Sequence, residues 1–326
     1  MKKLDLCISL AAVCIVSTMV LTTVPAAANG LVSVTPLGTH DGEFCRRDRA
    51  LLFEDPDGTT ILWDPGRTVR GPTDERLPAG GLDGVILSSL HSDHLGDRIP
   101  SVQNNGNCDN PTLDVDLRPA SNTTNILIGH VNAAMRVGGE MPNIINEKVG
   151  RTAARTLRPG GNAMIGGVGV AVIAAFHSNG LSSGFITDAT HKAELEADGL
   201  TGYGGLDHGY ILRFTNGLVV YLTGDTGHFG DMKHIVRDFY NPKLMVVNLG
   251  NGPSMGPEEG AFAVQLVNPK SVIPSHTNDR PGTIGGVPAP GSQMEAFSNL
   301  VNTADVHIPL SGVTMMFNMS GKCVNC

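Results

Sequence analysis

The sequence predicts an α/β fold in a single domain, and two observations support this prediction. Short apolar runs separated by Gly, Pro, Asn and Asp recur along the chain, which is typical of strands joined by turns. Helical patterns at 257–268 and 292–303 lie between such runs in the second half. No internal repeat or low-complexity linker divides the two halves, so we expect one domain rather than two.

The composition is that of a globular protein and does not favour a general nucleic-acid binder. The 326 residues are 41% hydrophobic and 17% charged, which is enough for a sizeable core. The 41 glycines indicate many tight turns. The formal net charge is −8, and no cluster of Lys and Arg appears that could follow a phosphate backbone. Nucleic-acid binding needs a clustered positive charge, so we expect no nucleic-acid partner.

The first 28 residues are typical of a secretory signal peptide. Lys2 and Lys3 precede an apolar segment at about 6–21, and Ala26-Ala27-Ala28 provides a small-residue cleavage site. The alternative is a retained membrane anchor, but this apolar run is short for a bilayer span. We therefore expect a mature domain at 29–326 that is periplasmic or secreted and has no stable membrane association.

Four cysteines lie in the expected mature chain, at positions 45, 108, 323 and 326. The C-x-x-C of Cys323 and Cys326 suits a local disulfide or a pair of thiols, and it supplies only half of a structural zinc site. Cys45 and Cys108 would then form the remaining pair, although four cysteines allow three pairings. This cysteine content is compatible with export.

Expected strands share a short apolar run that is bounded by turn residues. They lie at 31–38, 49–55, 59–66, 84–90, 167–176, 243–250 and 271–277, with further strand character at 307–319. Asp57-Gly58 and Asn216-Gly217 mark hairpin turns, the second within 209–225. Polar segments at 98–124, 178–206 and 277–292 are expected to be loops that shape the substrate site.

Histidine or aspartate follows five of the apolar runs. His91-Ser92-Asp93-His94 comes directly after 84–90, and the other four ends carry Asp64, His177, Asp225 and His276. One such residue is most often a helix cap or a solvated turn, and Asp93 could be a cap. Five in one chain are hard to ascribe to capping. Because ligand sites in α/β folds gather at the carboxyl ends of strands, and both side chains bind Zn²⁺, the pattern predicts a metal site.

This series of residues resembles the five motifs of the metallo-β-lactamase superfamily. The flanking residues agree too, with D-P-G at Asp64, L-T-G-D-T-G around Asp225 and I-P-S-H-T around His276. The resemblance extends over about residues 31–318, and 207–227 is more similar to lactonase-like members than to true β-lactamases. It implies an αββα sandwich and a metal-dependent hydrolase.

Carried over to this sequence, the resemblance implies two metal sites. His91 and His177 would bind the first metal, Asp93, His94 and His276 the second, and Asp225 both. Asp64 would orient a ligand through a hydrogen bond. Two such cations lower the pKa of a bound water, so that metal-bound hydroxide is available near neutral pH, and they polarise the scissile bond. Asp93 would accept a proton or steer this nucleophile.

Ser89 departs from the family pattern H-x-H-x-D-H, whose first histidine it replaces. A serine hydroxyl is a poor zinc ligand compared with imidazole, so Ser89 would only support the site. We therefore expect one or two zinc ions, with the tighter site at Asp93, His94, Asp225 and His276 and a weaker first site. Fe or Mn would also suit such a mixed N/O donor set.

The expected reaction is cleavage of a lactone, ester or related acyl bond in a small-molecule substrate. His40, His208 and His228 lie in neighbouring loops and are candidates for substrate contact. β-Lactam hydrolysis and phosphodiester cleavage are alternatives on the same fold. A metal-binding protein without catalysis is a further alternative, because the motif is incomplete. No G-x-S-x-G occurs, which disfavours serine-hydrolase chemistry.

Overall fold

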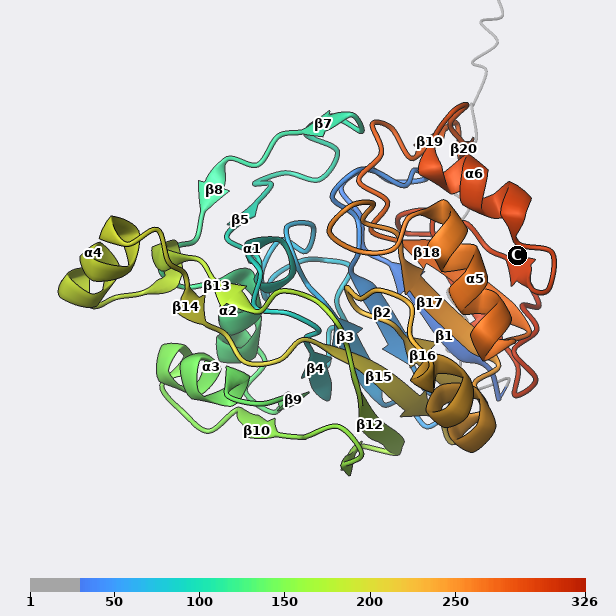
Figure 1. Ribbon diagram of the computed structural model, residues 1–326, viewed down its shortest axis with the longest axis horizontal. Coiled ribbons are helices and arrows are strands. Elements are labelled where there is room, and N and C mark those ends of the chain that lie inside the picture. The colour runs from blue at the N-terminus through green and yellow to red at the C-terminus, as the bar shows by residue number, and fades with distance from the viewer. Residues whose placement is uncertain (1–29) are drawn as a thin grey trace, which may run out of the picture.

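Two seven-stranded sheets pack face to face between two layers of helices in the computed structural model, which describes residues 30–326 (Figure 1). This arrangement confirms the predicted αββα sandwich. The expected signal peptide, residues 1–28, lies outside the described residues. Among residues 30–326, no helix combines the length and the apolar character needed to cross a bilayer.

The first sheet is formed mainly by the N-terminal half of the chain. Its strands β1, β2 and β3 are antiparallel, whereas β3, β4, β9 and β10 are parallel. Gly58, with φ of 91°, occupies the turn between β2 and β3, as the sequence predicts. In spatial order the strands are β10 (Ala154–Thr156), β9 (Ala134–Val137), β4 (Gly84–Ile86), β3 (Thr60–Trp63), β2 (Leu51–Glu54), β1 (Val32–Pro36) and β22 (Met315–Phe317).

The second sheet contains most of the C-terminal half. An antiparallel part ends in the predicted hairpin at Asn216-Gly217, and a parallel part begins with the next strand. Because parallel strands point the same way, the segments after β16 and β18 emerge at one edge. The order is β11 (Asn162–Ile165), β12 (Val168–Ala174), β15 (His208–Arg213), β16 (Val219–Leu222), β17 (Leu244–Asn248), β18 (Ser271–Ser275) and β21 (Asp305–Val306).

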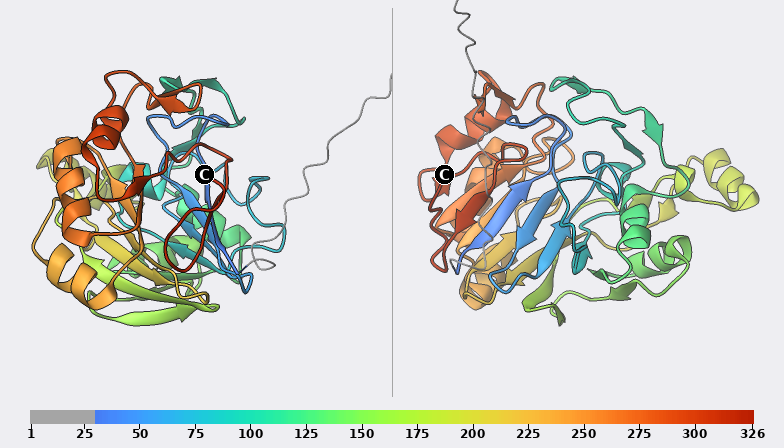
Figure 2. Two further views of the ribbon diagram at one scale, coloured as in Figure 1. Left: turned by 90° about the vertical axis from the view of Figure 1, so that its right-hand side faces the viewer. Right: turned by 180° about the vertical axis from the view of Figure 1, so that it is seen from behind.

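Helices cover the outer face of each sheet (Figure 1, Figure 2). Side chains of α2 and α3 pack on the first sheet, and those of η3, α5 and α6 pack on the second. Helix α4 extends from the body of the molecule and buries none of its residues. The helices are α1 (Ser92–Leu95), α2 (Asn122–Gly129), α3 (Met141–Val149), 3₁₀ helix η2 (Ser183–Phe185), α4 (Ala189–Ala197), π-helix η3 (Met232–Tyr240), α5 (Pro257–Val267) and α6 (Gln293–Leu300).

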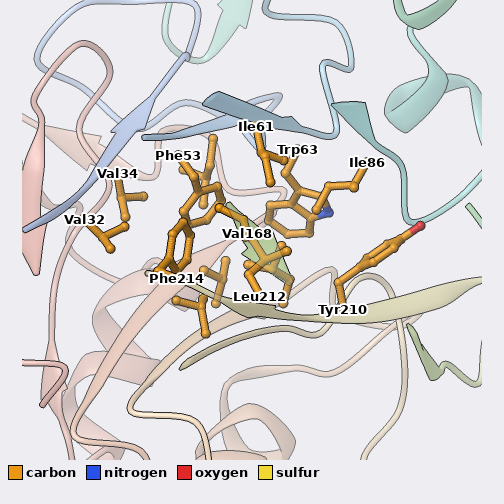
Figure 3. Close-up of a cluster of buried hydrophobic side chains, with 14 of the residues drawn as sticks. Val32, Val34, Phe53, Ile61, Trp63, Ile86, Val168, Tyr210, Leu212 and Phe214 are labelled. Atoms are coloured by element: carbon orange, nitrogen blue, oxygen red, sulfur yellow. The ribbon is translucent and has the colours of Figure 1, made fainter. Parts of the chain in front are cut away.

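The central core fills the space between the two sheets. Figure 3 shows Phe53 and Trp63 of the first sheet opposite Tyr210 and Leu212 of the second. Trp63 and Tyr210 are fully buried, and burial of one large apolar side chain stabilises a fold by about 1.5–3 kcal/mol. This packing fixes the relative position of the two sheets, and hence of the loops at their common edge.

The expected loops are more ordered than their composition indicates. Residues 98–124 form two small paired-strand units and the first turn of α2, which begins at Asn122. The disulfide between Cys45 and Cys108 joins this segment to the loop after β1, and Cys323 pairs with Cys326. The short pairs are β5 (Arg98–Ile99) with β8 (Val115–Asp116), β6 (Gly106–Asn107) with β7 (Asn110–Pro111), β13 (Gly180–Leu181) with β14 (Gly202–Tyr203), and β19 (Thr283–Ile284) with β20 (Val287–Pro288).

Candidate metal centre

The six predicted ligands meet at one end of the sandwich. Four loops bring them there, and these loops follow β4, β12, β16 and β18. Five of the six side chains line a cavity of about 240 Å³, and His94 is completely buried beneath it. The cavity-lining ligands are His91, Asp93, His177, Asp225 and His276. The strand ends of two sheets thus produce one site.

One candidate donor group consists of Asp93, His94 and His276. Their ligand atoms all lie within 4.8 Å of one another. The His94 and His276 rings stack with centroids 5.2 Å apart, and Nε2 of His276 is 3.3 Å from Oδ2 of Asp93. Both ring nitrogens of His276 are buried, and neither has a hydrogen-bond partner within the described chain. Such orphaned donor atoms fit a cation better than a closed hydrogen-bond network.

Asp93 does not cap helix α1, which was the alternative explanation of its position. The N-cap residue is His91, and no side chain caps the helix. The carboxylate of Asp93 instead points to the site, where it pairs with Arg49 and approaches His276.

A second group consists of His91, His177 and Asp207, whose ligand atoms also lie within 4.8 Å of one another. The two imidazoles meet edge to face with centroids 4.9 Å apart. Asp207, which the sequence analysis did not single out, precedes β15 and is 3% exposed. Burial raises the pKa of its carboxyl to about 7, although His94 and the adjacent Ser89 hydroxyl act in the opposite direction. No hydrogen bond of normal geometry reaches either oxygen from any described residue.

Asp225 lies between the two groups. Its Oδ2 is 3.0 Å from Nε2 of His94, 3.5 Å from that of His276 and 3.8 Å from that of His177. Its Oδ1 accepts a hydrogen bond of 2.9 Å from Asn248, so the carboxylate is held from behind. From this position Asp225 could contribute a ligand oxygen to a cation at either group.

Gly224 allows Asp225 to reach this position. It has φ of 62°, and a Cβ there would lie 2.5 Å from the carbonyl oxygen of His208. Only glycine combines this backbone conformation with so close an approach. The L-T-G-D sequence of the motif therefore has a local structural reason.

Asp64 and Ser89 lie behind the ligands, in the supporting positions that the sequence analysis gave them. Asp64 contacts Nδ1 of His94 at 2.8 Å and accepts hydrogen bonds from the backbone and the hydroxyl of Ser88. It has φ of 42°, a conformation that costs free energy and persists where the surroundings enforce it. Ser89 is fully buried, and its hydroxyl accepts a hydrogen bond of 3.0 Å from the His91 amide.

Arg49 is a further site residue that the sequence analysis missed. It is 4% exposed, and its Nη1 lies 2.5 Å from Oδ2 of Asp93. Burial alone would raise the pKa of Asp93, but Arg49 and the nearby histidines His94 and His276 outweigh it and hold the pKa well below its ordinary value. Asp93 is therefore ionised at neutral pH. A buried arginine at the start of an apolar strand was the available signal, since such a charge needs a partner.

The histidines and carboxylates of the site shift one another's pKa values. Burial lowers the pKa of His94, but Asp225 and Asp64 more than reverse this and raise it well above the ordinary value. His276 and His94 likewise overcome burial and hold the pKa of Asp225 well below its usual range. Burial and the neighbouring His177 lower the pKa of His91, which keeps its ring neutral. Neutral imidazoles and ionised carboxylates are the forms that bind metals, so His91, Asp93 and Asp225 are in the binding form, whereas His94 would give up a proton to a bound cation.

His40, His208 and His228 are placed away from the cavity lining. His40 is half-buried beside Thr39, and His228 is exposed with its ring against Phe262. His208 is buried against Gly138, and burial lowers its pKa to about 4. The structure therefore does not bring these three predicted substrate contacts to the metal-ligating residues.

Fold and site together define a metallo-β-lactamase-fold protein with donor groups for divalent metal. Residues 59–277 match the model of the beta-lactamase superfamily domain, and the chain belongs to this superfamily. Sequence relatives of the chain have more specific descriptions than the superfamily itself. A UPF0173 metal-dependent hydrolase of Rubrobacter xylanophilus is 30% identical over 68% of this chain and 75% of its own.

A second sequence relative and a solved structure are also similar to this chain. A UPF0173 metal-dependent hydrolase of Cupriavidus taiwanensis is 32% identical over 71% of this chain and 72% of its own. Igni18, a metallo hydrolase of Ignicoccus hospitalis, shares the fold with a TM-score of 0.55 and 21% identity, over 88% of this chain and 99% of its own. The protein is thus a metal-dependent hydrolase of the metallo-β-lactamase superfamily.

Proposed function

We propose that this protein is an exported hydrolase that uses two divalent metal ions to cleave a lactone, ester or related acyl bond in a small molecule. The observation that carries the proposal is the position of Asp225, whose Oδ2 faces histidines of both donor groups. Zinc is the leading metal because imidazole and carboxylate are among its usual ligands, and Fe or Mn would suit the same donors.

The residues of the site have separable tasks in this proposal. When bound, the metal pair supplies an activated water and polarises the scissile carbonyl. Asp93, held ionised by Arg49, accepts a hydrogen bond from the nucleophile and orients it. Asp64 fixes the His94 ring and Asn248 fixes the Asp225 carboxylate, two of the groups that would hold the metals. Preorganisation of this kind lowers the barrier because little rearrangement is needed during the reaction.

The walls of the cavity favour a small substrate without a strong negative charge. Besides the metal-ligating residues, the lining consists of Ser178, Gly250, Pro253, Ser254 and Asn278. None of these is basic. Phosphodiester substrates are usually bound with Lys or Arg at the phosphate, so an uncharged acyl group fits this lining better. β-Lactams share the acyl chemistry and remain the second candidate class.

A substrate panel with chelator controls tests the proposal. Purified protein loaded with zinc is assayed on γ- and δ-lactones, aryl esters, β-lactams and an aryl phosphodiester, and compared with Asp225→Asn and with chelator-treated wild type. We expect turnover of lactones or esters that both treatments abolish. Turnover that survives the chelator contradicts the metal mechanism. Bound metal without turnover of any substrate supports a non-catalytic metal-binding protein instead.

Export is supported by the pattern of residues 1–28 and by two disulfides in the described domain, since disulfides persist mainly outside the cytosol. We expect the mature chain to begin at Asn29 and to be free of the membrane. Expression in a secreting bacterial host followed by intact mass measurement of the periplasmic fraction tests this. A full-length chain recovered with the membranes would contradict it.

A further inference from the structure

The first donor group lacks a ligand at the position where the family pattern has histidine. Ser89 occupies that position, and its hydroxyl accepts a hydrogen bond from the backbone amide of His91. This hydrogen bond shapes the turn that carries His91. The group is left with two imidazoles, His91 and His177, as its only nitrogen donors among residues 30–326. The shared Asp225 would bring the first group to three ligands, the minimum for an open catalytic metal site, whereas the second group has three donors of its own beside Asp225. A matching third donor for the first group would have to come from elsewhere in the fold.

Asp207 lies where that ligand is needed. One of its carboxylate oxygens lies within 4.8 Å of a ring nitrogen of His91 and of a ring nitrogen of His177. It comes from the segment before β15, and therefore approaches from a different element than either histidine. Three elements of the fold thus converge on one small volume, which is the arrangement by which proteins build metal sites.

The surroundings of Asp207 compensate little of the cost of its burial. The residue is 3% exposed, and neither oxygen accepts a hydrogen bond of normal geometry from any of residues 30–326, although the Ser89 hydroxyl lies close enough to lower the pKa of the carboxyl. No salt bridge within this part of the chain includes it. A buried carboxylate without partners costs several kcal/mol. A cation held by His91 and His177 would compensate this cost.

We propose that Asp207 is the third ligand that belongs to the first metal alone, beside His91 and His177, and that it replaces the histidine that Ser89 displaces from the family pattern. This inference rests on the proposed two-metal function. Each metal would then have two imidazoles and one carboxylate of its own, and would share Asp225. The first site is consequently not the weak site that Ser89 alone predicts. Three carboxylates also offset three of the four positive charges of two divalent ions, and the added oxygen donor favours Zn, Fe and Mn over softer metals.

Metal counting on three variants tests this assignment. Each protein is loaded with zinc, dialysed against a weak chelator and analysed for zinc per chain. We expect two ions in wild type and one in Asp207→Asn. In Ser89→His/Asp207→Asn, the restored imidazole should return the count toward two. Asp198→Asn, which removes an exposed carboxylate, should keep two. Because loss of a residue behind the ligands already weakens metal binding 10–100-fold, loss of a direct ligand should weaken the first site at least about 100-fold.

Thermal unfolding separates a ligand from a structural residue. In metal-free protein, Asp207→Asn removes an unpaired buried charge, so its midpoint should equal or exceed that of wild type. In zinc-loaded protein the same variant should unfold at a lower temperature than wild type, because it holds one ion fewer. A purely structural aspartate would lower both midpoints, and that result would overturn the assignment.

The outcomes also distinguish this inference from the function on which it rests. A wild type that retains two ions while Asp207→Asn also retains two overturns the inference and leaves the two-metal function standing. A wild type that retains one ion overturns the inference as well, because the first site is then weak as Ser89 alone predicts. A wild type that binds no zinc, iron or manganese contradicts the proposed function itself.

Discussion

His94 and Asp64 form a fully buried pair in which Nδ1 of the ring lies 2.8 Å from Oδ2 of the carboxylate. Two hydrogen bonds from Ser88, to Oδ1 at 2.7 Å and to Oδ2 at 2.5 Å, hold the carboxylate in place. With Nδ1 engaged, Nε2 of His94 is the nitrogen that faces Asp225. The pair therefore selects both the orientation of the ring and the nitrogen that is offered to a metal.

Asp64→Asn should weaken metal binding at the second site without unfolding the protein. An asparagine amide can present its NH₂ group to Nδ1, which disturbs the tautomer that leaves Nε2 free. We expect a 10–100-fold loss of affinity, measured by competition with a chromophoric chelator. Asp83→Asn is a suitable control, because Asp83 accepts hydrogen bonds from Thr60 and takes no part in the site. Equal affinities for Asp64→Asn and wild type would contradict the role given to Asp64.

Arg49→Met should destabilise the metal-free protein more than the metal-loaded protein. Arg49 offsets the charge of Asp93, and breaking a buried pair costs up to 3–5 kcal/mol. Asp93 is 28% exposed, so solvent reduces this and we expect about 1–3 kcal/mol in the metal-free form. A bound cation offsets the same charge, so the loss should be smaller when metal is present.

Urea unfolding with and without zinc measures the two losses. Arg49→Lys, which keeps a positive charge, should lie between Arg49→Met and wild type. Identical losses in the two forms would show that Arg49 contributes through packing alone.

The sequence predicts which side chains meet at the site where each of them follows a strand. His177, Asp225 and His276 interrupt apolar runs in a way that a single sequence shows. Asp207 and Arg49 each precede a strand, so neither has this signal. Their roles depend on which segments meet in space, and this proximity follows from the packing of the two sheets. The sequence could therefore indicate that the family histidine is absent at Ser89, but not which other side chains lie near His91 and His177.

The helices differ in the same way: some have clear start signals in the sequence, and others depend on contacts with the sheets. The predicted α5 and α6 have clear start signals, namely Pro257 in the first turn of one, Ser292 as the cap of the other and a glutamate three residues after each cap. Helices α3 and η3 have no side-chain cap. Helix α2 has a cap at Ser121 whose reciprocal partner is Thr124 instead of Glu or Gln. Burial against the sheets, rather than local signals, accounts for these three helices.

Asp48 should make the stability of the fold depend on pH between about 4 and 6. Burial raises the pKa of its carboxyl to about 6, against hydrogen bonds from Cys45 and Thr39. The folded state therefore binds the proton more tightly than the unfolded state, whose pKa is about 3.8. The resulting stabilisation is complete below the unfolded pKa and is lost as pH rises through the folded pKa, by roughly 3 kcal/mol.

A comparison with Asp48→Asn isolates this effect from all other titrations. The unfolding free energy of the variant, relative to wild type, should rise by about 2.4 kcal/mol from pH 4 to pH 7, because asparagine has no charge to bury. Any constant offset between the two proteins is irrelevant to the test. Parallel pH profiles would contradict it.

The two disulfides should contribute unequally to stability. Cys45–Cys108 joins residues 63 apart in sequence, whereas Cys323–Cys326 joins residues 3 apart. In the chain-entropy model a cross-link stabilises by restricting the unfolded chain, and the effect grows with the length of the closed loop. Loss of the long-range disulfide should cost about 4 kcal/mol and loss of the local one about 2 kcal/mol.

Urea unfolding of Cys45→Ser/Cys108→Ser and of Cys323→Ser/Cys326→Ser, each against wild type, measures both values. The second pair is the matched control, since it removes the same chemical groups from a much shorter loop. If the two double variants lose equal stability, loop length does not govern the contribution. The Cys45–Cys108 variant should also unfold first in the 98–124 segment, because that disulfide ties the segment to the loop after β1. Proteolysis followed by mass spectrometry would locate the opened segment.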